Sequence, residues 1–171
     1  VLVDTPGLHR PRTLLGERLN NLVRATWAEV DTIGMCLPAD EKIGPGDKFL
    51  IRELAQLRRK PVFAIATKTD LVSPARLAEH LVSIAAAGEE AGLQWAQVVP
   101  VSAVAGDQVE LLASLLIDTM PPGPPLYPAG QLTDEPEETL IAEIVREAAL
   151  EGVHDELPHS ITVTIDEMGL R

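Results

Sequence analysis

The chain has 171 residues, of which 46% are hydrophobic and 3% aromatic, enough for one globular domain and part of a second. A single cysteine, Cys36, excludes an intramolecular disulfide and a multi-cysteine zinc site, which is typical of a reducing cytoplasm. The net charge of -12 is uneven, because residues 134–171 carry 11 acidic and two basic residues. Such an acidic segment binds phosphates poorly, so we expect any nucleic-acid-binding surface to lie elsewhere.

Apolar runs alternate with amphipathic helical patterns along residues 1–120. In chain order the patterns predict a strand at 1–3, a helix at 15–27, a strand at 32–37, a helix at 47–59, a strand at 61–66, a helix at 74–87, a strand at 97–101 and a helix at 107–120. Continuous apolar strands separated by helices are typical of a parallel sheet covered on both faces. We therefore expect an α/β domain with a doubly wound, mostly parallel sheet.

A proline-rich segment follows this domain. Five of the ten residues in Pro121–Gly130 are prolines, which neither a helix nor a central strand tolerates. We therefore expect a linker over residues 121–133. Beyond it the patterns predict a helix at 135–151 and a half-buried strand at 159–168. One helix and one strand cannot close a core, so we expect this second domain to be incomplete.

Polar or turn-forming residues follow three of the predicted strands, at 4–7, 67–70 and 102–103. Ligands of doubly wound sheets bind where the strands end. In the first segment, Asp4 can hold Mg²⁺ through a water, and Gly7 allows a backbone N–H to approach a terminal phosphate. The alternative is a strand-to-loop turn in which Pro6 and Gly7 serve backbone geometry alone.

The other two segments carry the residue types that recognise guanine. The carboxylate of Asp70 can accept two N–H groups from one edge of guanine, while the stem of Lys68 lies along the base. Small side chains at Ser102 and Ala103 would let the N–H of Ala103 reach the base carbonyl. Taken singly, each segment also fits an ordinary solvated loop. Their order, with each at a strand end, favours a guanine-nucleotide site.

With these residues placed, the chain resembles translation-factor-class GTPases, and most closely the Era family. The stretches "DTPGLH", "TKTD" and "SAVAG" resemble the third, fourth and fifth nucleotide motifs of that family. The stretch "DELPHSITVTIDE" at 155–167 resembles the entry to the KH RNA-binding domain that follows the Era GTPase domain. Double-GTPase (EngA-type) and tRNA-modifying (MnmE-type) proteins share the nucleotide motifs and remain the alternatives.

The resemblance assigns roles to the first motif. It makes Asp4 the magnesium-side acid and Gly7 the γ-phosphate contact of a mobile switch. Leu8 stands where Ras-like enzymes place a water-positioning Gln, so hydrolysis must use another group or a backbone contact. His9 is adjacent, but a polar loop histidine is more often solvated than catalytic.

The resemblance also assigns the base-recognition residues. It makes Lys68 and Asp70 the guanine readers, with Ser102 and Ala103 supporting the base. Thr67 replaces the Asn that is commoner in the fourth motif, which implies at most a retuned pocket. The cofactors implied are GTP or GDP and Mg²⁺.

Two family motifs are missing from these 171 residues. The phosphate-binding pattern G-x-x-x-x-G-K-[ST] is absent, and "GPGDK" at 44–48 is too short and predicts a helix-capping turn. The KH turn G-x-x-G is absent after Met168. We therefore expect Val1 not to be the natural start, both motifs to lie outside this chain, and the chain alone to be inactive as an enzyme.

As a whole, the resemblance implies a P-loop GTPase domain at 1–120 and the start of an α+β KH domain at 134–171. The implied function is a GTP-hydrolysing switch that binds small-subunit ribosomal RNA and the 30S subunit and assists small-subunit assembly. The implied protein is a cytoplasmic monomer with peripheral contact at the inner face of the cell membrane and no DNA partner. A non-catalytic GTPase-like scaffold is the alternative from another functional class.

Overall fold

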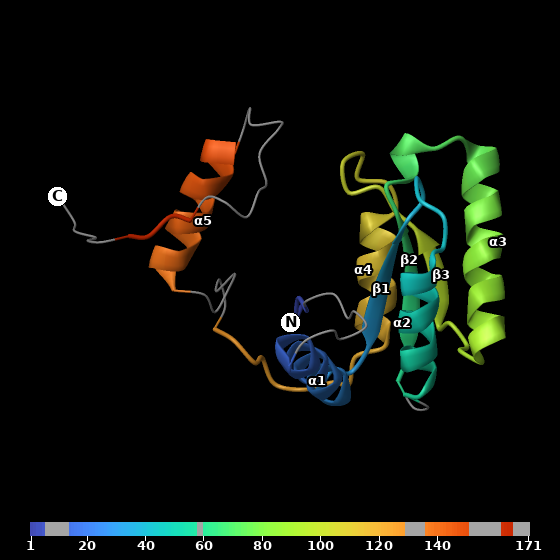
Figure 1. Cartoon of the computed structure of the whole chain (residues 1–171), viewed down its shortest axis with the longest axis horizontal. Coiled ribbons are helices and arrows are strands. Elements are labelled where there is room, and N and C mark those ends of the chain that lie inside the picture. The colour runs from blue at the N-terminus through green and yellow to red at the C-terminus, as the bar shows by residue number, and fades with distance from the viewer. Residues whose placement is uncertain (6–13, 58–59, 129–135, 151–161, 166–171) are drawn as a thin grey trace. The chain divides into compact units, whose positions relative to one another are not determined.

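The computed structural model describes residues 1–5, 14–57, 60–128, 136–150 and 162–165. Its elements are α1 (Leu14–Glu29), β1 (Ile33–Pro38), α2 (Pro45–Ala55), β2 (Val62–Thr67), the short 3₁₀ helix η1 (Thr69–Leu71), α3 (Pro74–Ala91), β3 (Gln97–Pro100), α4 (Val109–Asp118) and α5 (Glu137–Leu150) (Figure 1). The chain divides into two compact units, Val1–Gly123 and Pro124–Arg171, which are described separately below.

The first unit contains a three-stranded parallel sheet in the order β1-β2-β3. Ile33 of β1 lies opposite Val62 of β2, and Phe63 of β2 lies opposite Gln97 of β3. Helices connect the strands, as parallel pairing requires. The predicted α/β class with a parallel sheet is confirmed, and the strands end at one common edge.

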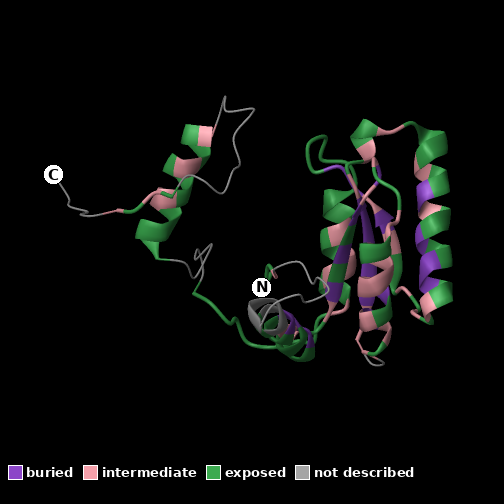
Figure 2. Ribbon diagram, in the orientation of Figure 1, coloured by how far each residue is buried: buried purple, intermediate pink, exposed green. Residues whose placement is uncertain are grey.

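Helices cover both faces of this sheet because side chains alternate along each strand (Figures 1 and 2). The first face packs against α1, α2 and α3, and its buried residues are Val23, Trp27, Ile33, Met35, Leu37, Ile51, Leu54, Val62, Ala64, Ala66, Ile84 and Ala87. The second face packs against α4, and its buried residues are Phe63, Ile65, Val99 and Val101, with Leu112, Leu115 and Leu116 partly buried against them. Aliphatic side chains therefore make up most of the core, and Trp27 and Phe63 are its buried aromatic members.

Local capping explains where α2 and α3 begin. The N–H of Gly44 donates to Oδ2 of Asp47 at 2.7 Å, and Pro45 occupies the first turn of α2. The predicted capping role of "GPGDK" is confirmed. Ser73 caps α3 by accepting from the N–H of Arg76 at 3.4 Å, and α3 stops at Gly92, whose φ is +71°.

The predicted strand at residues 1–3 is wrong. Residues 1–5 form no strand, and Val1, Leu2 and Val3 are 78%, 92% and 57% exposed. A strand needs a neighbour with which to exchange backbone hydrogen bonds. Among the described residues β1 pairs with β2 alone, and no strand pairs with residues 1–3. An apolar run predicts burial, but it cannot supply the partner.

Further boundaries differ from the predictions. Helix α3 continues beyond the predicted residue 87 to Ala91, and α4 spans Val109–Asp118 rather than residues 107–120. Helix α2 ends at Ala55, with Gln56 as its C-cap, so the predicted extension to residue 59 is wrong at 56–57, and residues 58–59 lie outside the described ranges. Residues 162–165 form no strand, although Thr162 and Thr164 are exposed and Val163 and Ile165 half-buried. The rest of the predicted strand at 159–168 lies outside the described ranges.

The second unit contributes α5, which was predicted over residues 135–151. Its apolar side chains Leu140, Ile144 and Val145 are 46%, 55% and 47% exposed. Across both units, none of the helices in the described ranges is long and apolar enough to cross a membrane.

Candidate nucleotide-binding site

The ends of β2 and β3 bring Asp70, a predicted guanine reader, into contact with Ser102, which was predicted to support the base. The hydroxyl of Ser102 donates to Oδ1 of Asp70 at 2.5 Å. Ser102 is fully buried, whereas Asp70 is exposed on η1. None of the residues that the structure describes donates to Oδ2 of Asp70. The hydrogen bond at Oδ1 therefore orients the Asp70 carboxylate, and Oδ2 stays available to accept from a ligand.

Backbone hydrogen bonds fix both loops that carry this pair. The N–H of Thr69 donates to the carbonyl oxygen of Val101 at 3.4 Å, which joins the loop after β2 to the end of β3. The N–H of Ser102 donates to the carbonyl oxygen of Asp107 at 3.1 Å, and the N–H of Ala105 donates to the Ser102 hydroxyl at 3.0 Å. These bonds close a compact turn, in which Ala103 is exposed.

Lys68, which follows β2 directly, has an unusual backbone conformation. Its φ of 57° and ψ of 38° are left-handed, which is uncommon for a residue other than glycine. Its half-exposed ammonium lies 3.7 Å from Oδ2 of Asp40. The sequence reasoning missed Asp40; its signal was an acid two residues after β1, at the same sheet edge.

Asp4 is not joined to this group by any interaction among the described residues. It is exposed, and no hydrogen bond or ion pair within the described ranges joins it to Lys68, Asp70 or Ser102. Cys36 of β1 is an exposed residue whose thiol is partly covered: this partial burial raises the pKa of the thiol, and the negative charge of the nearby Asp4 raises it further. The predicted residues Gly7, Leu8 and His9 lie outside the described ranges.

A single exposed carboxylate can still serve Mg²⁺. The described residues contain no group of three or more His, Cys, Asp or Glu side chains suited to a metal. Mg²⁺ keeps several waters and is commonly held by one or two carboxylates together with substrate phosphates. The exposed side chain of Asp4 fits that donor set.

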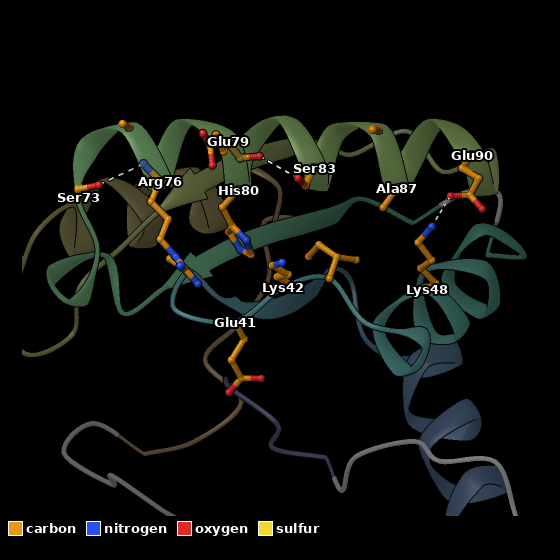
Figure 3. Close-up of a pocket in the computed structure, with 14 residues that line it drawn as sticks. Glu41, Lys42, Lys48, Ser73, Arg76, Glu79, His80, Ser83, Ala87 and Glu90 are labelled. Atoms are coloured by element: carbon orange, nitrogen blue, oxygen red, sulfur yellow. Dashed lines mark hydrogen bonds and ion pairs between the residues drawn. The ribbon is translucent and has the colours of Figure 1, made fainter.

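A groove of about 750 Å³ lies between α3 and the loop that joins β1 to α2 (Figure 3). Nε2 of the buried His80 lies 3.3 Å from the carbonyl oxygen of Leu37 at its floor, and Lys48 pairs with Glu90 at 2.8 Å on its rim. Its lining contains three basic and three acidic side chains, Lys42, Lys48, Arg76, Glu41, Glu79 and Glu90. It includes none of the predicted site residues, and its mixed charge does not favour an anion.

Comparison with known proteins extends over the whole chain. The chain is 65% identical over 171 residues to GTPase Era of Nocardioides sp. (strain ATCC BAA-499 / JS614). The alignment covers 100% of this chain and 55% of that protein. The chain is 64% identical to GTPase Era of Streptomyces coelicolor, covering 98% of this chain and 53% of that protein. No family model matches the chain.

Solved structures agree in fold. A crystal structure of Era in complex with MgGDPNP and nucleotides 1506–1542 of 16S ribosomal RNA superposes with a TM-score of 0.79 at 31% identity, covering 96% of this chain and 54% of that one. A variant of Aquifex aeolicus Era bound to GDP and AlF4⁻ gives 0.78 at 30% identity, with the same coverage. The chain spans about half the length of the relatives it matches, and it belongs to the Era family of GTPases.

Proposed function

We propose that this chain carries the guanine-recognition part of a GTP-hydrolysing Era-type switch protein. The observation that carries the proposal is the contact between Asp70 and the buried Ser102 at the carboxyl edge of the sheet. Solved Era structures bound to MgGDPNP and to GDP with AlF4⁻ support it through their similarity. GTP hydrolysis is proposed for the full gene product, because the phosphate-binding motif is not among these residues.

In this proposal, the carboxylate of Asp70 would select guanine over adenine. Guanine presents a ring N–H and an exocyclic amine on one edge, and a carboxylate can accept from both. Adenine lacks that pair of donors. The 2.5 Å bond from Ser102 restricts rotation of the carboxylate, so less entropy is lost when the base binds. Lys68 would cover one face of the base, and the N–H of Ala103 would reach the base carbonyl.

The phosphate-side roles rest on sequence and resemblance. Bound Mg²⁺ would neutralise charge on the β- and γ-phosphates. Asp4 would hold one of its waters, and the backbone of Gly7 would contact the γ-phosphate, so that the following loop reorders between nucleotide states. With Leu8 in the position of the usual Gln, another group or a backbone contact would orient the attacking water.

The KH assignment and the ribosomal partner are also proposals. Helix α5 and the DELP-containing stretch at 155–167 support residues 134–171 as the start of a KH domain, with 121–133 as the linker. A similar Era structure contains nucleotides 1506–1542 of 16S ribosomal RNA, which supports small-subunit ribosomal RNA as the partner and small-subunit assembly as the process. We place the protein in the cytoplasm as a monomer, with peripheral contact at the inner membrane face.

Substitution of the guanine-reading carboxylate tests the proposed function. In the full gene product, we expect Asp70→Asn to shift preference from GDP toward xanthosine diphosphate by roughly a hundredfold or more, because a buried hydrogen-bonding pattern rejects the mismatched base strongly. Competition against a fluorescent guanine nucleotide measures the shift. Asp118→Asn on the exposed surface of α4 is the control.

Two outcomes would contradict the proposal. An unchanged base preference in Asp70→Asn would remove Asp70 from the reading role. Failure of the unmodified gene product to bind GDP at all would favour a GTPase-like binding module without catalysis.

A further inference from the structure

One carboxylate beside the candidate site has an unusual environment. Asp40 lies two residues after β1, and its Oδ1 is buried without a hydrogen-bond partner among the described residues. Most buried polar atoms in proteins are hydrogen-bonded, so such an orphaned acceptor requires an explanation. Its other oxygen, Oδ2, lies 3.7 Å from the ammonium of Lys68, the cation with which it forms an ion pair in the described part of the chain.

The backbone around Asp40 is held from two sides. The N–H of Ala39 donates to the carbonyl oxygen of Thr67 at 2.8 Å, which joins the segment after β1 to the end of β2. The guanidinium of Arg76 donates to the carbonyl oxygen of Asp40 at 2.9 Å, which joins it to α3. The backbone that carries this carboxylate is therefore held by two neighbouring elements, independently of the ion pair.

Lys68 has less support of its own. Its side chain is 50% exposed, and a long exposed lysine stem samples many rotamers. Its backbone is left-handed, with φ at 57°, and within the described ranges its ammonium forms an ion pair with Asp40. Asp40, whose backbone is held in place, thus pairs with the half-exposed side chain of Lys68 beside the candidate site.

We propose that Asp40 is a positioning residue for nucleotide binding, which holds the Lys68 ammonium so that the lysine stem is pre-ordered against the guanine base. The inference rests on the proposed function, since it assigns Asp40 a role in the same site. An exposed ion pair of this kind contributes little to the folded state. The consequence of losing it is therefore expected in nucleotide affinity rather than in stability.

The first experiment measures the dissociation constant of fluorescent GDP for the full gene product. We expect Asp40→Asn to weaken binding about threefold to fivefold, the range typical of one half-exposed charge pair. Asp40→Glu, which keeps the charge and has a longer reach, should retain most of the affinity. Glu41→Gln is the matched control, because Glu41 is the adjacent acid, is exposed and forms no ion pair in the described ranges.

A second variant separates positioning from a general structural role. If Asp40 acts through Lys68, Asp40→Asn should cause no further loss in a Lys68→Met background, measured by competition at millimolar GDP. Urea unfolding of Asp40→Asn without nucleotide should match that of the unmodified protein.

The outcomes are distinct. Three results would each overturn the inference. The first is unchanged GDP affinity in Asp40→Asn, and the second is a loss of stability that accounts for the weaker binding. The third is that Asp40→Asn lowers GDP affinity equally in the unmodified protein and in the Lys68→Met variant. If Asp70→Asn still switches base preference in that case, the proposed function stands without it. Absence of GDP binding in the unmodified gene product would overturn both.

Discussion

The thiol of Cys36, on strand β1, has a raised pKa. Its pKa is raised first by burial and then by the nearby carboxylate of Asp4, and both effects favour the neutral thiol in the folded protein. The stabilisation from this shift is fully present below the usual thiol pKa of about 8.5. It is lost as the pH rises through the raised pKa of the folded state. Folding stability should therefore fall on the alkaline side.

Alkylation of this thiol tests the contribution of Asp4. The thiolate is the reactive form, so we expect iodoacetamide to modify Cys36 at pH 8 more slowly than it modifies a free cysteine. Asp4→Asn removes the neighbouring charge and should speed the reaction, although the partial burial of the thiol should keep the rate below that of the free thiol. Because Cys36 is the sole cysteine of the chain, intact mass reports on this site alone. An unchanged rate in Asp4→Asn would show that the two residues do not interact in solution.

Helix α3 depends on one glycine where it meets the loop before β3. Gly88 is buried, and a Cβ atom there would lie 2.9 Å from Cδ1 of Trp95 and 3.0 Å from the carbonyl oxygen of Leu93. The Trp95 ring cannot easily move away, because its Nε1 donates to the carbonyl oxygen of Ile84 at 3.1 Å. The close approach of backbone and ring requires the absence of a side chain at this position.

We therefore expect Gly88→Ala to lower the free energy of unfolding by about 1–3 kcal/mol, the usual cost of overpacking. The loss should exceed the gain in helix propensity that alanine otherwise brings. Gly46→Ala in α2 is the matched control, since a Cβ there meets nothing within 4 Å. That variant should leave stability unchanged or raise it by up to about 1 kcal/mol in urea titrations. Equal effects of the two substitutions would contradict this packing argument.

Elements were predictable from sequence where one local pattern determines them. The strand at 61–66 is continuous and apolar, and β2 lies one residue from it, because a strand buried on both faces needs little else to define it. Pro74 predicted the start of α3 in the same way, and Ser73 caps that helix in the structure. The apolar run at 1–3 failed because a strand also needs a partner, which no local pattern reports.

The candidate site shows the same division. The meeting of Asp70 and Ser102 follows from strand ends that share one edge, so order and spacing sufficed to predict their proximity. Asp40 was missed because acids after strands are common, and its ion pair with Lys68 depends on the exact register of β1 against β2. The assignment of both residues to nucleotide binding stays a prediction.

At the scale of the whole molecule, the net charge of -12 is unfavourable for RNA binding by these 171 residues. Residues 134–171 carry 11 acidic and two basic residues, although they include the proposed start of the RNA-binding domain. On α5 the one basic side chain, Arg146, lies 3.5 Å from Glu143 and is already paired. Neutralising phosphates requires lysine and arginine, whose release of counterions supplies most non-specific affinity.

We therefore expect the 171 residues alone to show no measurable affinity for a 16S ribosomal RNA 3′-end fragment at physiological salt. The full gene product should bind it, with affinity falling steeply between about 50 and 200 mM salt, as expected when several phosphates are neutralised elsewhere in the protein. Fluorescence anisotropy with labelled RNA measures both. Substituting Glu137 and Glu138 with Gln offers a control, since removing two exposed charges should raise non-specific binding only slightly. Tight, salt-dependent binding by the 171 residues would show that a basic surface forms within them, and it would contradict the expectation that the RNA-binding surface lies elsewhere in the protein.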